Sequence, residues 1–365
     1  MKEQVIGFIG LGLIGGSIAR GLKRSDTSNV TIMAYMRTRS TLERAKEDGI
    51  VDVILDGIDE SLSRCDIIFL CTPVEYNASY LQKIRPLLKP GAILTDVGST
   101  KTNIHKTVTK LGMEAVFVGG HPMAGSEKTG YENSTDHLLE KAYYIITPTA
   151  KTSPLQIERM RRIALAIGAI PMVLDYSEHD YSVAAVSHLP HLIASSLVNL
   201  VRDSDNKEEI MRQLAAGGFK DITRIASSSP VMWEQICMTN GENIKILLRK
   251  YIKSLEQVYS DLDSHNNVAI HRLFEESGAY RSTFSSQSRG PMIPEYSFSV
   301  DIVDEPGSIA ILSAILAAKG IGIKDIGLNH SREYGEGTLR ICFYDEDSRK
   351  MAADVLKKHN YTLSK

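Results

Sequence analysis

Residues 5–22 read VIGFIGLGLIGGSIARGL, and this stretch decides the fold of the N-terminal part of the chain. An apolar β-type run leads into a GxGxxG loop, after which a helical pattern begins. The first glycine allows a tight turn, the second lets the backbone approach a pyrophosphate, and the third permits close helix packing. The helix N-terminus adds free N–H groups and the positive end of its dipole. We therefore predict a dinucleotide site formed by Gly10, Leu11, Gly12, Leu13, Ile14 and Gly15.

The residues after the second predicted strand leave the cofactor preference open. Folds that bind NAD place an acidic residue about twenty positions after the third glycine, where it holds the ribose hydroxyls. Met36 occupies that place here, and Arg37 follows it. An arginine contacts a 2′-phosphate, stacks on adenine or is simply a solvated loop residue. We expect NAD, leave NADP open, and assign Arg37, Thr72 and Pro73 to the cofactor site.

The periodicity of apolar residues divides the chain into four parts. Short β-branched runs alternate with helical patterns as far as Pro171, which predicts a parallel, doubly wound sheet. Long helical patterns follow, then a segment rich in Ser, Gly and Pro, then a βαββαβ pattern typical of a ferredoxin-like plait. We predict an α/β Rossmann domain over 1–172, an all-α domain over 173–281, a linker over 282–294 and an α+β domain over 295–365.

Composition narrows the class of protein. The chain has 42 basic and 44 acidic side chains, a net charge of −2, which favours neither nucleic acid nor an anionic membrane as partner. Its four cysteines form no CxxC pair, which argues against structural zinc and a disulfide framework and fits a reducing cytoplasm. We find no signal peptide and no uninterrupted apolar run long enough to span a bilayer. We expect a cytoplasmic protein that acts on a small molecule.

Two polar segments follow predicted strands, TDVGSTK at 95–101 and GGHPMAGSEKTG at 119–130. Open α/β sheets bind ligands at this carboxyl edge. His121, on a rigid turn between Gly and Pro, is the candidate general base; the alternative is that its nitrogens only brace the turn. Ser99 either fixes the tautomer of His121 or caps the following helix. Glu127 either sets the charge of the pocket or is an ordinary loop acid.

The predicted helical domain adds cationic candidates. His188 and His191 share one helix face, with Pro190 between them to bend the helix. No carboxylate or cysteine at ligand spacing joins them, so we favour substrate contact and predict no metal site. Arg224, in GGFKDITRIASSSPVMW, suits a substrate carboxylate; the alternative is a surface ion pair with an acid one turn away.

Taken together, GLGLIGGS, CTPVEY, TDVGSTK, GGHPMAGSEKTG, VSHLPH and GGFKDITRIASSSPVMW resemble the prephenate dehydrogenase family. The segment VDIVDEPGSIAILSAIL resembles an ACT domain, as found fused to Bacillus-type members of that family. The resemblance covers nearly the whole chain. It implies NAD-dependent oxidative decarboxylation of prephenate to 4-hydroxyphenylpyruvate, a step toward tyrosine.

The resemblance also implies roles for individual residues. His121 is the base, Ser99 orients it, Glu127 lines the entrance, and His191 and Arg224 bind substrate, with His188 a weaker candidate. The helical domain is expected to form a homodimer. L-tyrosine is the expected effector at the ACT domain, where Asp304 either holds its ammonium group or caps a helix. The effector site is assigned to Asp304, Glu305, Pro306, Gly307, Ser308 and Ile309.

Two other functions share most of these features. An arogenate dehydrogenase would differ in its contacts to an amino group, and relative turnover of the two substrates separates it from a prephenate dehydrogenase. A catalytically silent amino-acid sensor would bind tyrosine and turn over nothing. A sensor has no need for a base beside a nicotinamide site, so His121, Ser99 and Arg224 argue against it.

Overall fold

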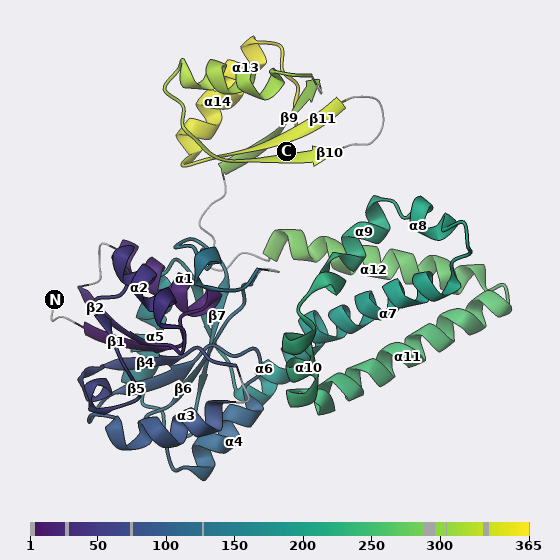
Figure 1. Cartoon of the computed structure of the whole chain (residues 1–365). Helices are drawn as coiled ribbons and strands as arrows, with labels where there is room; N and C mark the ends of the chain where they lie inside the picture. The colour runs from purple at the N-terminus through teal and green to yellow at the C-terminus, as the bar shows by residue number, and fades with distance from the viewer. Residues whose placement is uncertain are drawn as a thin grey trace. The chain divides into compact units, whose positions relative to one another are not determined.

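The computed structural model describes residues 4–25, 29–73, 76–125, 128–287, 296–303, 305–330 and 336–364. The chain forms two compact units, Met1–Ser286 and Gln287–Lys365. The first unit contains both the predicted nucleotide-binding part and the predicted helical part (Figure 1).

A five-stranded parallel sheet forms the centre of the nucleotide-binding part. Its strands are β1 (Gln4–Ile9), β2 (Val30–Tyr35), β3 (Val53–Ile54), β4 (Ile67–Leu70) and β5 (Ile93–Asp96). They lie in the order β3-β2-β1-β4-β5, and every neighbouring pair is parallel. The strand order reverses between β1 and β4, which creates the crevice at the carboxyl edge where such sheets bind nucleotides. The predicted doubly wound fold is confirmed for these strands.

Helices cover both faces of this sheet. They are α1 (Leu13–Arg24), α2 (Arg39–Glu47), α3 (Asn77–Ile84), α4 (Thr102–Lys110) and α5 (Pro154–Ala166). Alternate residues along a strand point to opposite faces. In β1, Phe8 therefore packs with α1, α2 and α5, whereas Ile9 packs with α3 and α4. Both faces are buried, as parallel sheets require.

A second sheet corrects the prediction that all strands as far as Pro171 are parallel. It contains β6 (Val118–Pro122), β7 (Tyr143–Pro148) and β8 (Ile170–Val173), and β7 runs antiparallel to β6. Parallel neighbours need a crossover, usually a helix. Between β6 and β7 the described residues form only one short 3₁₀ turn, η4 (Tyr131–Asn133), so the chain returns in the opposite direction.

The helical part contains α6 (Tyr176–Val183), η5 (Ala184–His188), α7 (Leu189–Ser204), α8 (Ile210–Leu214), α9 (Gly217–Thr223), η6 (Arg224–Ser227), α10 (Pro230–Thr239), α11 (Gly241–Asp263) and α12 (Asn267–Gln287). The η5 segment is a turn of π-helix just before Pro190. Proline has no N–H for the carbonyl four residues earlier and its ring crowds that carbonyl, so the helix widens there. Helix α12 continues to Gln287, so the prediction that the linker begins at 282 was wrong.

The predicted start of the linker was wrong for a compositional reason, because residues 282–287 are Ser-rich but contain neither Gly nor Pro. The rest of the predicted linker lies outside the described residues. The continuous helical stretch Tyr176–Ser204 is 29 residues long and contains an 18-residue window with a mean hydropathy of 1.3, enough by length and composition to cross a membrane, whereas no such segment was expected from the sequence. It carries His179, Asp180 and His188, which are buried against the rest of its own unit. Such groups are costly inside a bilayer, so we interpret the stretch as the central helix of the helical part.

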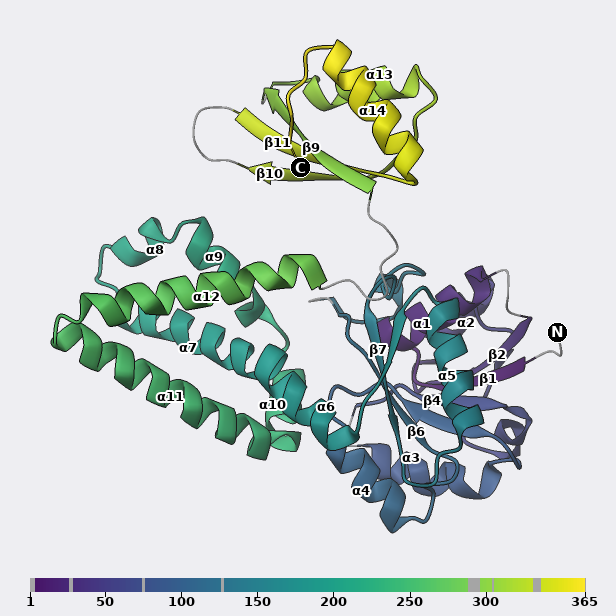
Figure 2. The same ribbon diagram turned by 180° about the vertical axis from the view of Figure 1, so that it is seen from behind.

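The second unit has the predicted βαββαβ order. Its elements are β9 (Tyr296–Val303), α13 (Ser308–Ala317), β10 (Ile323–His330), β11 (Glu336–Phe343), α14 (Glu346–Lys358) and β12 (Leu363–Ser364). The sheet order is β10-β11-β9-β12, and all neighbours are antiparallel. Both helices lie on the same face (Figure 2), where Leu312 and Leu356 pack against Val300 and Ile341.

Candidate active site

The glycine loop has the shape that a dinucleotide requires. Gly10 has a φ of +90°, and a Cβ there would lie 2.6 Å from the Cys71 carbonyl oxygen. A Cβ on Gly15 would lie 2.8 Å from the Gly10 carbonyl oxygen. At Gly12 a Cβ would meet nothing within 4 Å. Packing therefore demands glycine at positions 10 and 15, whereas Gly12 keeps open the space over the N-terminus of α1 that a pyrophosphate would use.

The other predicted cofactor residues differ in what they offer. The Leu11 side chain is fully buried, so only its backbone faces a ligand. The Thr72 hydroxyl lies 3.4 Å from the Asn77 amide oxygen, and Pro73 is exposed just after β4. The central carbon of the Arg37 guanidinium lies 5.5 Å from the Tyr76 ring centroid. These residues follow β1, β2 and β4, at the carboxyl edge of the parallel sheet.

His121 is a strand residue, not a turn residue, because β6 continues through it to Pro122. Its imidazole is 8 % exposed, and its Nδ1 lies 2.7 Å from Nε2 of His179. His179 Nδ1 in turn lies 2.9 Å from Asp180 Oδ1, and both of these side chains are fully buried. Since Nδ1 of His121 is engaged, Nε2 is the nitrogen that can accept a proton from a substrate.

Ser99 does neither of the two things predicted from the sequence. No hydrogen bond joins it to His121 in the part of the chain that the structure describes, because His179 holds the Nδ1 edge. It does not cap α4 either, since Lys101 occupies the N-cap. Asp180 accepts the Lys101 and Thr102 N–H groups at 2.7 and 2.8 Å and so completes that helix end. Sequence reasoning missed His179 and Asp180, although both stand in the conspicuous polar run SEHD.

A buried ion pair fixes the backbone beside His121. The Lys101 ammonium donates to the Asp96 carboxylate and, at 2.7 Å, to the Gly120 carbonyl oxygen. Asp96 also accepts the Gly120 N–H at 3.2 Å. Burial lowers the pKa of His121 well below its usual range, and His179 and the Lys101 charge lower it further. His121 is therefore neutral near neutral pH, as a general base must be.

The two histidines of VSHLPH have different surroundings. His188 is buried, its Nδ1 accepts from the Asn240 amide at 3.1 Å, and burial lowers its pKa to about 4, so it is a core residue. His191 Nδ1 donates to the Ser187 carbonyl oxygen at 2.8 Å, which leaves Nε2 for a ligand. Its ring stacks on Trp233 with centroids 3.7 Å apart.

Arg224 belongs with His191. Burial lowers the pKa of His191, and the nearby Arg224 charge lowers it further, which places the two in the same electrostatic environment. Arg224 is solvent-exposed at the start of η6.

Glu127 lies outside the described residues. Within those residues no group of three or more potential ligands could hold a metal ion.

The chain is similar to known proteins over nearly its whole length. Residues 18–173 match the family model described as prephenate dehydrogenase, nucleotide-binding domain, and residues 175–276 match prephenate dehydrogenase, dimerization domain. The prephenate dehydrogenase of Bacillus subtilis is 33% identical over 359 residues, 98% of this chain and 96% of that protein. The chain belongs to the prephenate dehydrogenase family. It is therefore an oxidoreductase with a nucleotide-binding domain.

Two solved structures resemble the chain. Prephenate dehydrogenase from Aquifex aeolicus, in complex with hydroxyphenyl propionate and NAD⁺, is 31% identical with a TM-score of 0.72, covering 78% of this chain and 99% of its own. Synechocystis arogenate dehydrogenase is also 31% identical, with a TM-score of 0.70, covering 77% and 100%. The match to the Bacillus subtilis relative is longer and extends into the second unit.

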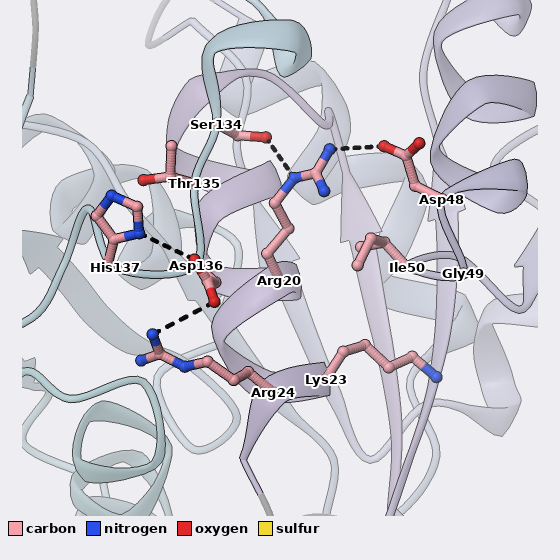
Figure 3. Close-up of a pocket in the computed structure, with 10 residues that line it drawn as sticks. All are labelled: Arg20, Lys23, Arg24, Asp48, Gly49, Ile50, Ser134, Thr135, Asp136 and His137. Atoms are coloured by element: carbon pink, nitrogen blue, oxygen red, sulfur yellow. Dashed lines mark hydrogen bonds and ion pairs between the residues drawn. The ribbon is translucent and has the colours of Figure 1, made fainter.

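A separate cavity of about 540 Å³ lies at the C-terminal end of α1 (Figure 3). Its cations are already paired, Arg20 with Asp48 at 2.7 Å and Arg24 with Asp136 at 3.3 Å. The glycine loop is at the opposite end of the same helix. This cavity is therefore not the family's nucleotide site.

Two buried histidines are expected to make stability depend on pH. Burial lowers the pKa of His105 and of His188 to about 4, against about 6.5 in an unfolded chain. Between these values the unfolded chain binds more protons, so stability falls as the pH falls, by about 2 kcal/mol for each histidine at about pH 5. Urea unfolding should show a lower midpoint at about pH 5 than at about pH 7. His105→Gln should reduce this difference, and equal midpoints for the unaltered protein would contradict the prediction.

Proposed function

We propose that the chain catalyses the oxidative decarboxylation of prephenate to 4-hydroxyphenylpyruvate. The observation that carries this proposal is the neutral, buried imidazole of His121, which lies on strand β6 of the nucleotide-binding part. His179 and Asp180, both on α6, support it through hydrogen bonds. A dehydrogenase that acts on an alcohol needs such a base. The 31% identity to a family member crystallised with NAD⁺ and hydroxyphenyl propionate adds support.

The cofactor is NAD, which supplies the hydride acceptor; Gly12 and the N-terminus of α1 would hold its pyrophosphate. His121 Nε2 accepts the proton of the ring hydroxyl as hydride leaves the same carbon. The bond to the ring carboxylate breaks, CO₂ leaves, and its electron pair completes the aromatic ring. His121 then returns the proton to the phenolate oxygen. The rest of catalysis is positioning.

Prephenate carries two carboxylates, which need cationic or hydrogen-bonding partners. Arg224 is our choice for one of them, with His191 Nε2 as a second contact. The flat stack of His191 on Trp233 forms one wall for the ring. Ser99, on the loop between β5 and α4, is proposed instead as a contact to the ring hydroxyl, and Glu127 remains a candidate at the entrance.

Turnover tests the proposal directly. Purified protein with NAD should form NADH with prephenate and much less with arogenate. A preference for arogenate would favour the second candidate, an activity named for the Synechocystis relative. A protein that binds NAD and turns over neither substrate would instead be a sensor.

Arg37 is proposed to contact a 2′-phosphate, which makes NADP an alternative cofactor. Met36 provides no carboxylate that would repel the 2′-phosphate of NADP. Arg39 forms ion pairs with Asp56 and Glu43, so Arg37 is the better candidate for this contact. Loss of one charge-assisted hydrogen bond costs about 2 kcal/mol. Arg37→Ala should weaken NADP binding about 10-fold or more in calorimetry and leave NAD binding nearly unchanged. Arg39→Ala is the matched control, and equal weakening of both dinucleotides by Arg37→Ala would remove this role.

We propose that the helical part forms a homodimer. The helix α11 has 23 residues, of which only Ile244 is buried. Large apolar side chains on α11 and α12 are exposed, including Tyr259 at 73% and Phe274 at 71%. Large exposed apolar side chains mark sites of protein association where they gather on a surface. A second copy of the chain is the partner that the family's dimerization domain implies.

Aspartates in this surface should dissociate the dimer. Tyr259→Asp with Phe274→Asp removes two anchors, each worth about 1.5–3 kcal/mol when buried, and adds charge. The dimer dissociation constant should rise at least about 100-fold in sedimentation or light scattering. Leu165→Asp, on α5 and 61% exposed, is the control and should remain dimeric. A monomeric unaltered protein, or a dimer that survives both aspartates, contradicts the assignment.

We propose that the second unit is an ACT domain that binds L-tyrosine and inhibits the enzyme. Gly307 has a φ of +100°, precedes α13, and a Cβ there would meet nothing within 4 Å. Its loop is therefore open to a ligand whose carboxylate would face the helix N-terminus. Glu305, Pro306 and Ile309 are exposed beside it, and Asp304 lies outside the described residues. Tyrosine, with phenylalanine as control, should lower the rate of NADH formation.

The proposed location is the cytoplasm. Cys65, Cys71, Cys237 and Cys342 form no disulfide bond with one another within the described residues. Burial raises the pKa of the Cys65 thiol to about 11, so this thiol is inert. Cysteines that stay in the thiol form fit a reducing compartment.

A further inference from the structure

Three titratable side chains are linked by hydrogen bonds in a row that leads from the candidate base into the protein. His121 lies on β6, and His179 and Asp180 lie on α6, 58 residues away along the chain. The two links are 2.7 Å from His121 Nδ1 to His179 Nε2 and 2.9 Å from His179 Nδ1 to Asp180 Oδ1. His179 and Asp180 are fully buried. Burying such groups is costly unless all their hydrogen bonds are made.

The proton positions follow from Asp180. Burial by itself raises the pKa of this carboxyl, but hydrogen bonds from His179, Thr102 and Lys101 outweigh burial and hold the pKa below its ordinary value. Asp180 is therefore ionised and can only accept. His179 must then carry its proton on Nδ1, and its Nε2 accepts the Nδ1 proton of His121. This assignment places the lone pair of His121 on Nε2, as a base requires.

We propose that His179 and Asp180 are positioning residues that hold His121 in its base tautomer and share the positive charge formed when it takes the substrate proton. As a proton arrives at His121 Nε2, the proton on Nδ1 moves to His179 Nε2, so the imidazolium charge lies beside Asp180. The shift reverses when His121 returns its proton to the product. This inference rests on the proposed function.

The other charges near His121 do not supply this stabilisation. Lys101 and His188 both disfavour the protonated form of His121. The Lys101 ammonium is itself paired with the Asp96 carboxylate. Asp180 is the carboxylate that reaches the imidazole pair by hydrogen bonds. A purely structural role for Asp180, joining α6 to the N-terminus of α4, is the alternative to test.

The test uses His179→Gln and Asp180→Asn, with His105→Gln as matched control. His105 is also a buried imidazole, with its Nε2 2.9 Å from the Thr147 hydroxyl, but it is not hydrogen-bonded to His121, His179 or Asp180. His179→Gln and Asp180→Asn should lower kcat about 10²- to 10³-fold, since either change lets His121 hold its proton on Nε2. Dissociation constants for NAD and prephenate should stay within about 3-fold of the unaltered values, since neither residue is placed in contact with them.

The pH profile separates positioning from mere stability. Removing the Asp180 charge disfavours protonated His121, so the acid limb of kcat should move to lower pH in Asp180→Asn. A structural role would lower the melting temperature and leave the limb in place. If the variants do not fold, ¹⁵N-histidine NMR of the unaltered protein decides, with an unprotonated Nε2 expected on His121 and a protonated Nδ1 on His179.

The outcomes distinguish this inference from the function itself. The proton shift from His121 through His179 to the side of Asp180 is called the relay here. If the unaltered protein turns over prephenate and the His179→Gln variant is as active as His105→Gln, the relay is overturned and the proposed function stands. NMR showing the opposite tautomer of His121 also overturns the relay. If the unaltered protein does not turn over prephenate, the proposed function fails and the relay fails with it.

Discussion

Replacing His121 with asparagine is expected to lower kcat by about 10²- to 10⁴-fold, the usual contribution of a general base. The asparagine amide can still donate a hydrogen bond to His179 Nε2, so the surrounding packing should be retained. It cannot accept the substrate proton. The rate of NADH formation, measured with saturating NAD and prephenate, checks the prediction.

Binding should survive this substitution. The dissociation constant for prephenate, measured by calorimetry, should change by less than about 5-fold, because the contacts that hold the substrate in its ground state do not depend on proton transfer to the base. His137→Asn, at an exposed histidine outside the site, is the control and should keep full activity. A His121→Asn protein with an unchanged rate would exclude His121 as the base.

Replacing Gly12 with valine is expected to abolish most cofactor binding without unfolding the protein. A Cβ at this position meets no protein atom within 4 Å, and the backbone φ of −88° suits an ordinary residue. The added side chain fills space needed by the pyrophosphate, at a cost of at least about 3 kcal/mol, or roughly 100-fold in the NAD dissociation constant. Calorimetry with NAD measures the affinity, and thermal unfolding measures the stability.

Gly10→Val is the matched comparison. Its φ of +90° and the Cys71 carbonyl oxygen 2.6 Å from the added Cβ mean that the fold itself must shift. This variant should therefore lose stability as well as NAD binding. If Gly12→Val binds NAD normally, the pyrophosphate does not lie over the N-terminus of α1.

Local sequence patterns determined which elements form and where the cofactor loop lies. The GxGxxG spacing identifies the loop from neighbouring residues alone, although the close contact of Gly10 with Cys71 is made only in the folded sheet. The alternation of strands and helices likewise predicted the parallel sheet and the βαββαβ order of the second unit. The position of His121 after a β-type run was sufficient to nominate it as the base.

The tertiary structure alone decided what His121 touches. Its partner His179 is 58 residues away, and the Asp180 carboxylate caps a helix 79 residues earlier in the chain. Ser99 was the natural sequence candidate for this role, yet the packing of α6 against α4 and β7 places His179 there instead. The reversed direction of β7 and the burial of His188 were decided in the same way. Spacing in sequence reports on local backbone preference, whereas buried hydrogen bonds depend on which elements meet across the core.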